Sequence, residues 1–209
     1  MPPFDQSTYQ VRLEWGVDGL ARLAPAEIVV VVDVLRFSTT VIDAVQRGER
    51  YRLDAAAHAV SINGAAVAAA AADAGALVLL GALTNASAVA AAALAEQQRR
   101  GARTSIAVIA AGELGSVDAR LRFAMEDQLG AGAVVDALGA LGIDHTSPDA
   151  AVAAESFRAL RRAAKHLLTA SGSGLELIER GRQDEVLAAA AVDAASLVPV
   201  LRDGVFRAY

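Results

Sequence analysis

The stretch from Ile28 to Thr40 decides the fold, and it reads Ile-Val-Val-Val-Val-Asp-Val-Leu-Arg-Phe-Ser-Thr-Thr. Its first five residues are apolar and β-branched, which is typical of a central parallel strand that is buried on both faces. Asp33 and Arg36 follow, and a helical pattern then runs from Phe37 to about Arg47. The chain is therefore predicted to pass from a buried strand through a polar turn into a helix.

The polar turn combines a carboxylate, a guanidinium and three hydroxyls, from Asp33, Arg36, Ser38, Thr39 and Thr40. In open α/β sheets, ligands bind beyond the carboxyl ends of the strands, and the free N–H groups at a helix start attract anions. The turn is therefore a candidate site for a phosphate or a carboxylate, with oxygen atoms that could also hold a metal. A second interpretation is purely structural, in which a Ser or Thr caps the helix and Asp33 pairs with Arg36.

Two more units of strand, polar turn and helix follow in the sequence. The first is a strand over Ala76 to Leu80 with a helix over Ala86 to Arg100, and the second is a strand over Ser105 to Ala110 with a helix from about Val117 to Leu138. Parallel neighbouring strands need connections of this length. A mostly parallel sheet is therefore expected.

The last part of the chain predicts an antiparallel element. Asp203-Gly204 stands between the apolar runs Leu197 to Arg202 and Val205 to Ala208, which is a strong signal for a type I′ hairpin. We expect this pair at the edge of the sheet, which makes the sheet mixed. The predicted fold is a three-layer α/β/α arrangement, with residues 1–209 as a single domain.

Composition excludes several classes of protein. The 209 residues are 55% hydrophobic and carry a net charge of −5, so one domain with a substantial core is expected and no basic face indicates a nucleic-acid partner. The absence of cysteine excludes a disulfide framework, thiolate catalysis and a Cys-ligated zinc site. Without a leader-like N-terminus or a long uninterrupted apolar run, we expect no membrane association and a cytoplasmic location.

Nucleotide-binding motifs are absent, and carboxylates remain the best candidates for chemistry. The only lysine is Lys165, which no Gly precedes and no Ser or Thr follows, so there is no P-loop. The carboxylates of Asp33, Glu113, Glu126 and Asp127 fall at predicted strand ends or just after them. Such oxygen donors suit Mg²⁺, which binds one or two carboxylates, keeps some waters and bridges to a substrate phosphate.

Several segments, in order, resemble one known family. The segment Val32 to Thr40 resembles the signature of the 2-phosphosulfolactate phosphatases, the ComB family. Ile62 to Ala65 resembles the Thr-Asn-Gly-Thr turn of that family, and Gly81 to Ala88 resembles its Gly-Ser-x-x-Asn-x-x-Ala segment. Met125 to Asp127, followed by Gly130 to Gly132, resembles its Glu-Asp and Ala-Gly motifs. Each match is weak alone, but the ordered set is specific.

The resemblance implies a Mg²⁺-dependent acid phosphatase with an α/β/α fold, which cleaves the phosphate ester of 2-phosphosulfolactate. The partner would be a small phosphorylated acid, and a homo-oligomer is compatible with this family. The implied catalytic residues are Asp33, Arg36 and Asp127; the implied phosphate-binding residues are Ser38, Thr39, Thr40, Asn63 and Asn85; and the implied metal ligands are Asp33, Glu126 and Asp127.

The chain also departs from the family. Only the fifteen residues from Gly48 to Ile62 precede Asn63, where the family carries a longer segment with a Gly-Phe-Asp-Leu-Gly-Asn-Ser-Pro-like stretch. Ile62 and Ala65 replace the two Thr hydroxyls. Two functions therefore stay open: a Mg²⁺-dependent phosphatase for a small acid such as 2-phosphosulfolactate, or a catalytically degenerate protein on the same fold that binds anions or forms oligomers. The first function makes the chain an enzyme, and the second does not.

Overall fold

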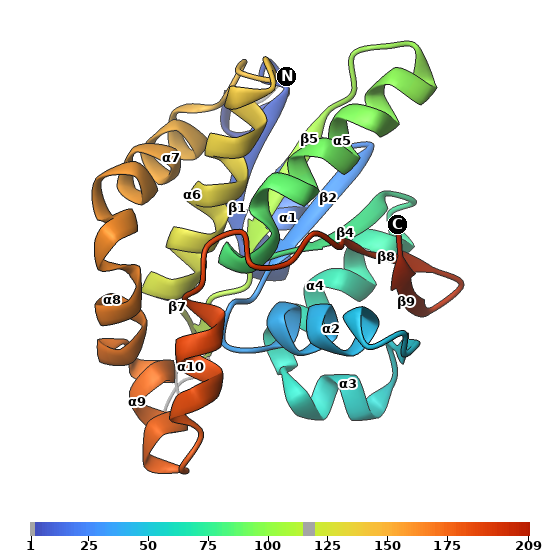
Figure 1. Ribbon diagram of the computed structural model, residues 1–209. Helices are drawn as coiled ribbons and strands as arrows, with labels where there is room; N and C mark the ends of the chain where they lie inside the picture. Colours follow the sequence, from blue (N-terminus) through green and yellow to red (C-terminus); the bar gives the residue numbers. More distant parts are fainter. Residues whose placement is uncertain (1–2, 115–119) are drawn as a thin grey trace.

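The computed structural model describes residues 3–114 and 120–209 of the chain. Figure 1 shows a sheet whose strands alternate along the chain with helices. The strands are β1 (Val11–Trp15), β2 (Ile28–Val32), β3 (Tyr51–Arg52), β4 (Leu77–Gly81), β5 (Ile106–Ala110), β6 (Glu113–Leu114), β7 (Leu121–Arg122), β8 (Pro199–Arg202) and β9 (Val205–Ala208).

The helices vary widely in length. The α-helices are α1 (Gly16–Arg22), α2 (Phe37–Gln46), α3 (Ala55–Val60), α4 (Ile62–Asp73), α5 (Ala86–Arg100), α6 (Met125–Ala140), α7 (Pro148–Leu160), α8 (Ala164–Ala170), α9 (Gly172–Glu179) and α10 (Gln183–Ala189). Short 3-10 helices cover Pro3–Asp5, Leu83–Asn85 and Arg161–Ala163. None of the helices in residues 3–114 and 120–209 combines the length and the apolar character needed to cross a membrane.

The main sheet of the described chain has seven strands, in the order β1-β5-β2-β4-β8-β9-β3. Strands β1, β5, β2 and β4 run parallel to one another. Strands β8, β9 and β3 extend the sheet beyond β4 with antiparallel pairing. The predicted sheet, mostly parallel but mixed, is confirmed.

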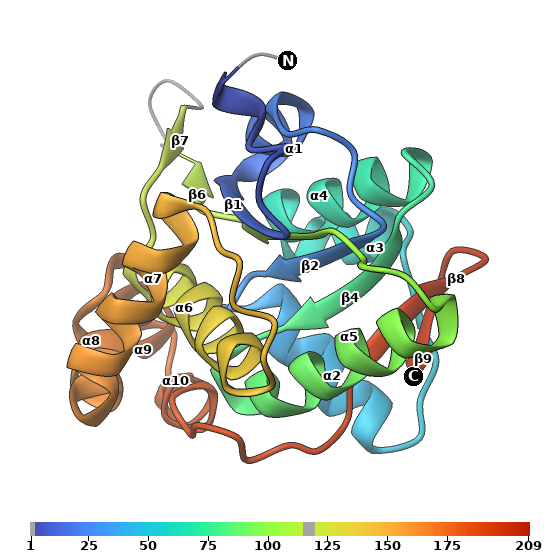
Figure 2. The same cartoon turned by 90° about the horizontal axis from the view of Figure 1, so that it is seen from above.

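Strand β2 lies in the middle of the parallel part and is buried along its whole length. Val30 and Val32 belong to the hydrophobic core beneath α5 and α6, whereas Val29 and Val31 belong to the core beneath α2 and α4. Figure 2 shows α5 and α6 on one side of the parallel strands and α1 and α4 on the other. The predicted three-layer α/β/α fold is confirmed, and the continuous apolar run of β2 is explained by the two cores.

The C-terminal hairpin is confirmed, but its position in the sheet is not the predicted one. Asp203 and Gly204 have φ angles of 52° and 71°, as a type I′ turn requires, and β8 pairs antiparallel with β9. The hairpin lies inside the sheet, because β8 also pairs with β4 and the short strand β3 pairs with β9. The edge strand at this end of the sheet is therefore β3.

The helix predicted from about Val117 to Leu138 is wrong at its start. Residues 117–119 lie outside the described part of the chain, and Leu121–Arg122 form β7, which pairs with β6. The helix α6 begins at Met125 and carries Glu126 and Asp127 in its first turn. Acidic side chains are favoured at this end because the helix dipole is positive there, so the local sequence explains the later start.

Glu96 on α5 is 4% exposed and accepts hydrogen bonds from two arginines on the same helix. Arg99 donates to it from Nε at 2.8 Å and from Nη2 at 2.6 Å, and Arg100 donates from Nε at 2.7 Å. The hydrogen bonds from Arg99 lower the pKa of Glu96 to about 2; burial opposes this shift and Arg100 adds to it. The ionised carboxylate therefore stabilises the fold above its unfolded pKa of about 4.3, and this stabilisation is lost as the pH falls through the folded value.

We expect Glu96→Gln to lower the free energy of unfolding by about 1 kcal/mol at neutral pH. The value is small because the Arg99 side chain is 69% exposed and therefore screened by solvent. Urea denaturation of both proteins at neutral pH and near pH 3 measures the difference, which should shrink at the lower pH. Glu155→Gln on α7 is the control, since Glu155 also pairs with an arginine but is 70% exposed. An equal difference at both pH values would contradict the assignment.

Candidate active site

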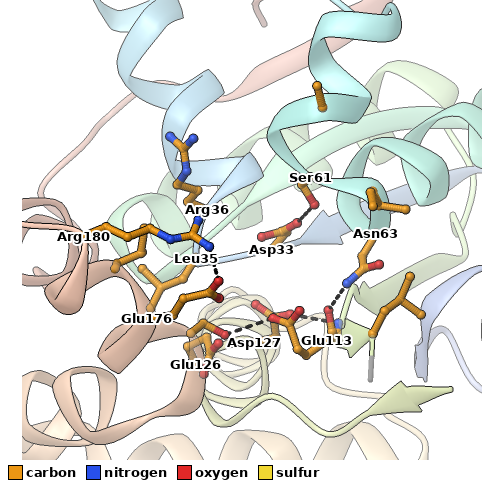
Figure 3. Close-up of a pocket in the computed structure, with 16 residues that line it drawn as sticks. Asp33, Leu35, Arg36, Ser61, Asn63, Glu113, Glu126, Asp127, Glu176 and Arg180 are labelled. Atoms are coloured by element: carbon orange, nitrogen blue, oxygen red, sulfur yellow. Dashed lines mark hydrogen bonds and ion pairs between the residues drawn. The ribbon is translucent and has the colours of Figure 1, made fainter. Parts of the chain in front are cut away.

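A cavity of about 460 Å³ opens where β2 ends and the chain turns toward α2. Its walls come from the ends of β2 and β5, from the starts of α4 and α6, and from α9 (Figure 3). The polar residues that line it are Asp33, Arg36, Ser61, Asn63, Glu113, Glu126, Asp127, Ser173, Glu176 and Arg180. The structure therefore brings together Asp33, Arg36, Asn63, Glu126 and Asp127 from the set of predicted site residues.

Asp33 is buried at the end of β2, and both of its carboxylate oxygens have hydrogen-bond donors. The Phe37 N–H donates to Oδ1 at 3.0 Å, and the Ser61 hydroxyl donates to Oδ2 at 2.5 Å. Ser61 also caps α4, because its Oγ accepts from the Gly64 N–H at 3.0 Å. The start of α4 is thus fixed directly against Asp33, with Ser61 as the link.

Asp127 is buried in the first turn of α6 and holds two strand ends together. Its Oδ1 accepts from the Val34 N–H at 2.7 Å, and its Oδ2 accepts from the Gly112 N–H at 2.9 Å. Val34 follows β2 and Gly112 follows β5. These bonds fix the orientation of the Asp127 carboxylate at the floor of the cavity.

Asn63 lies in the first turn of α4, and its side chain reaches the loop that follows β5. Its Nδ2 donates to the carbonyl oxygen of Gly112 at 2.8 Å. Because Asn63 also lines the cavity, its amide both connects α4 to the end of β5 and leaves the side-chain oxygen as an acceptor for a ligand.

The buried carboxylates repel one another. Burial raises the pKa of Asp127 well above its ordinary value, and the charges of Asp33 and then Glu126 raise it further. Burial also raises the pKa of Asp33; the Ser61 hydroxyl and a backbone N–H oppose the rise, and Glu113 adds to it. A cation bound among these groups would offset their repulsion.

The hydroxyls after Asp33, which were predicted to bind phosphate, do not line this cavity. The Ser38 Oγ accepts from the Asp33 N–H at 3.0 Å, and the Thr39 Oγ1 donates to the carbonyl five residues earlier at 2.7 Å. The Thr40 N–H makes a helical hydrogen bond to the Arg36 carbonyl at 2.9 Å. Thr39 and Thr40 line a neighbouring cavity instead. These three residues hold the turn and the helix start. The structural interpretation is nevertheless wrong in its details, because the residue at the N-cap of α2 is Arg36, without a side-chain capping bond, and Arg36 pairs with Glu185 rather than with Asp33.

Asn85 is also held away from the cavity. Its side chain is fully buried; Oδ1 accepts from the Ala82 N–H at 2.9 Å, and Nδ2 donates to the carbonyls of Leu80 and Leu197, each at 3.1 Å. The Asn85 amide therefore connects the end of β4 to the segment that leads into β8. The prediction of a phosphate-binding role for Asn85 is not supported by this geometry.

Helix α9 and Arg180, the residue that directly follows it, supply three lining residues that the sequence did not single out. Ser173, Glu176 and Arg180 are spaced i, i+3 and i+7, which places them on one face of the helix. The Ser173 hydroxyl donates to Glu113 Oε2 at 3.1 Å, and Arg180 forms an ion pair with Glu176. The signal that could have identified them is this i, i+3, i+7 spacing of polar side chains, although the core residue Leu177 lies on the same face and also lines the cavity.

The donor chemistry of the cavity fits a hard divalent cation. Carboxylate and amide oxygens from Asp33, Glu113, Glu126 and Asn63 face one space, and Mg²⁺ prefers such ligands. In residues 3–114 and 120–209, no three His, Cys, Asp or Glu side chains are close enough together to hold a metal by themselves. Mg²⁺ typically uses one or two protein carboxylates and completes its shell with waters and substrate oxygens, so the residues present fit that ion.

Comparison with known proteins identifies the family. A search of the curated proteins found no match. A sequence model of the family described as 2-phosphosulpholactate phosphatase matches residues 54–204 of the 209-residue chain. The matched part contains Asn63, Glu126 and Asp127, whereas Asp33 and Arg36 precede it and are connected to it by the structure. The match spans well over half of the chain, and the chain therefore belongs to the 2-phosphosulpholactate phosphatase family.

Proposed function

We propose that this protein is a Mg²⁺-dependent phosphatase that hydrolyses the phosphate ester of a small acid such as 2-phosphosulfolactate. The observation that carries the proposal is the cavity lined by two buried, fixed carboxyl groups, Asp33 and Asp127, and by Arg180. The family match supports phosphatase chemistry in general. The proposal adds the metal, the residues and the class of substrate.

The hydrolysis needs an acceptor for one proton. Water forms a new P–O bond, the ester P–O bond breaks, and a proton passes from the water to the departing alkoxide. We assign the acceptor role to Asp33, because it lines the cavity and burial raises its pKa above the ordinary value, which makes a carboxylate a better general base. Asp127, which the two backbone N–H groups hold in place, fixes the strand ends around the reacting atoms.

We propose that Glu126 and Asp127 would hold Mg²⁺, with the charges of Asp33 and Glu113 beside them. The ion, when bound, neutralises negative charge that develops on the phosphoryl and leaving-group oxygens. For the protein itself, the carboxylates supply the negative charge that attracts the cation, and their mutual repulsion favours its binding. Without a cation the same charges repel an anionic substrate.

The test is phosphate release from a panel of small phosphorylated acids, 2-phosphosulfolactate included, with added Mg²⁺ and with a chelator. We expect release only in the presence of Mg²⁺. The melting temperature of the chelated protein should also rise when Mg²⁺ is added, because a ligand that binds only the folded state stabilises it. Release that continues in the chelator would contradict the metal requirement, and no release from any ester would favour the degenerate, anion-binding alternative.

Gly64 permits the close approach of α4 to Asp33, and Gly64→Ala should damage the site. A Cβ at this position would lie 2.5 Å from Asp33 Oδ2, 2.9 Å from Asp33 Cβ and 3.0 Å from Phe37 Cβ. Shifting a reacting group by about 1 Å costs roughly 100-fold in rate, so we expect kcat/KM to fall by about 10- to 100-fold. Circular dichroism should show an unchanged helix content, and full activity in the variant would contradict the placement of Asp33.

A further inference from the structure

The arginine side chain that points into the cavity is Arg180, and not Arg36 as the sequence suggested. Arg180 directly follows α9 and lines the cavity, and Figure 3 shows its guanidinium directed inward next to Glu176. Arg36, which the sequence suggested as the phosphate clamp, has its guanidinium directed away from Asp33 and Asp127 in the same view.

The contacts of Arg36 agree with this view. Its Nη1 lies 3.8 Å from Glu185 Oε2 on α10, and Arg36 also lines the neighbouring cavity beside Thr39 and Thr40. Glu185 is bound more closely by Arg182, through two hydrogen bonds of 2.6 Å. Arg36 is thus oriented toward α10, and its guanidinium does not occupy the centre of the candidate active site.

The ion pair between Arg180 and Glu176 is the feature that points to an anionic ligand. Glu176 and Arg180 form an ion pair across one helical turn, with their side chains 57% and 64% exposed, respectively, and both line the cavity. An exposed ion pair of this kind contributes little net free energy. A carboxylate that holds a guanidinium at the mouth of an acidic cavity can therefore be exchanged for another anion at small cost.

We propose that Arg180 binds the phosphoryl group of the substrate and that Glu176 occupies the guanidinium until the phosphate displaces it. This inference rests on the proposed phosphatase function and names a binding residue for it. The guanidinium suits the task because its planar fork can donate two parallel hydrogen bonds to phosphate oxygens. Glu176 is then a competitor of the substrate for Arg180, and it also holds the side chain of Arg180 beside the cavity.

The test uses direct binding of inorganic phosphate to the full chain in the presence of Mg²⁺, at constant ionic strength, followed by ³¹P NMR or calorimetry. Arg180→Gln should weaken phosphate binding by about tenfold to a hundredfold, the range expected for loss of one charged hydrogen-bonding group. Glu176→Gln should tighten it by about twofold to fivefold, because the competing anion is removed. Glu155→Gln, from a remote exposed ion pair on α7, is the control and should leave the binding constant unchanged.

The opposite signs of the two effects separate binding from a structural role. Equal phosphate affinity in Arg180→Gln and the wild type would overturn the inference, and so would equal weakening by both variants, which a merely structural ion pair predicts. A wild type that binds no phosphate also overturns it. Failure of the proposed function looks different: phosphate then binds in an Arg180-dependent way, while no ester in the panel is hydrolysed.

Discussion

Replacing Asp33 by Asn should lower Mg²⁺-dependent phosphate release by about 1,000-fold, within the range that a lost general base produces. The substitution keeps the size of the side chain and an acceptor for the Phe37 N–H, which donates to Oδ1 at 3.0 Å. It removes the charge that takes up the proton and that helps to bind the cation. The measurement is kcat/KM for the best substrate of the panel, at saturating Mg²⁺.

The melting temperature of Asp33→Asn shows whether the activity is lost through the chemistry or through unfolding. Because the folded pKa of Asp33 is raised, folding opposes ionisation of the group, and at neutral pH the charged carboxylate destabilises the chelated protein. Asp33→Asn should therefore melt at the same or a higher temperature than the wild type, although it is inactive. Asp43→Asn, which removes an exposed carboxylate from the nearby helix α2, is the control for activity. An active Asp33→Asn enzyme would remove Asp33 from the proposed mechanism.

The central part of the fold could be predicted from the sequence because a strong local pattern specified it. An apolar, β-branched run such as Ile28–Val32 is typical of a strand with helices on both sides, and Asp203-Gly204 favours one kind of turn. The strand order could not be predicted, since pairing between distant segments is not a local property. The start of α6 was missed because Leu121, Met125 and Leu129 have helical spacing, while the pairing of β7 with β6 takes Leu121 out of that helix.

The site was only partly predictable for a related reason. A sequence shows that a polar residue follows a strand, but it does not show on which side of the turn the side chain lies. Asp33 and Asp127 reach the cavity, whereas the Ser38 hydroxyl and the Asn85 amide bond to neighbouring backbone groups. Arg180 was missed because α9 is remote in sequence from every motif and meets the cavity only through packing of the helices after α6.

The largest effect on stability is expected from Gly132→Ala, which tests the packing that carries α6 and its acidic first turn. A Cβ at Gly132 would lie 2.1 Å from the Ala153 carbonyl oxygen and 2.9 Å from Phe157 Cβ, both on α7. The two helices must separate to accept it, which costs about 3 kcal/mol and lowers the melting temperature by roughly 6–12 °C. Thermal and urea denaturation of the chelated protein measure this change.

Gly139→Ala supplies a matched control, because the same substitution is made in the same helix, where a Cβ would have no atom within 4 Å. Alanine is intrinsically favoured over glycine in a helix by up to about 1 kcal/mol, so this variant should be as stable as the wild type or more stable. Helix propensity alone predicts that both variants gain stability. Opposite signs therefore identify the close contact between α6 and α7 as the cause, and equal changes in both variants would show that the two helices pack less closely than this structure has them.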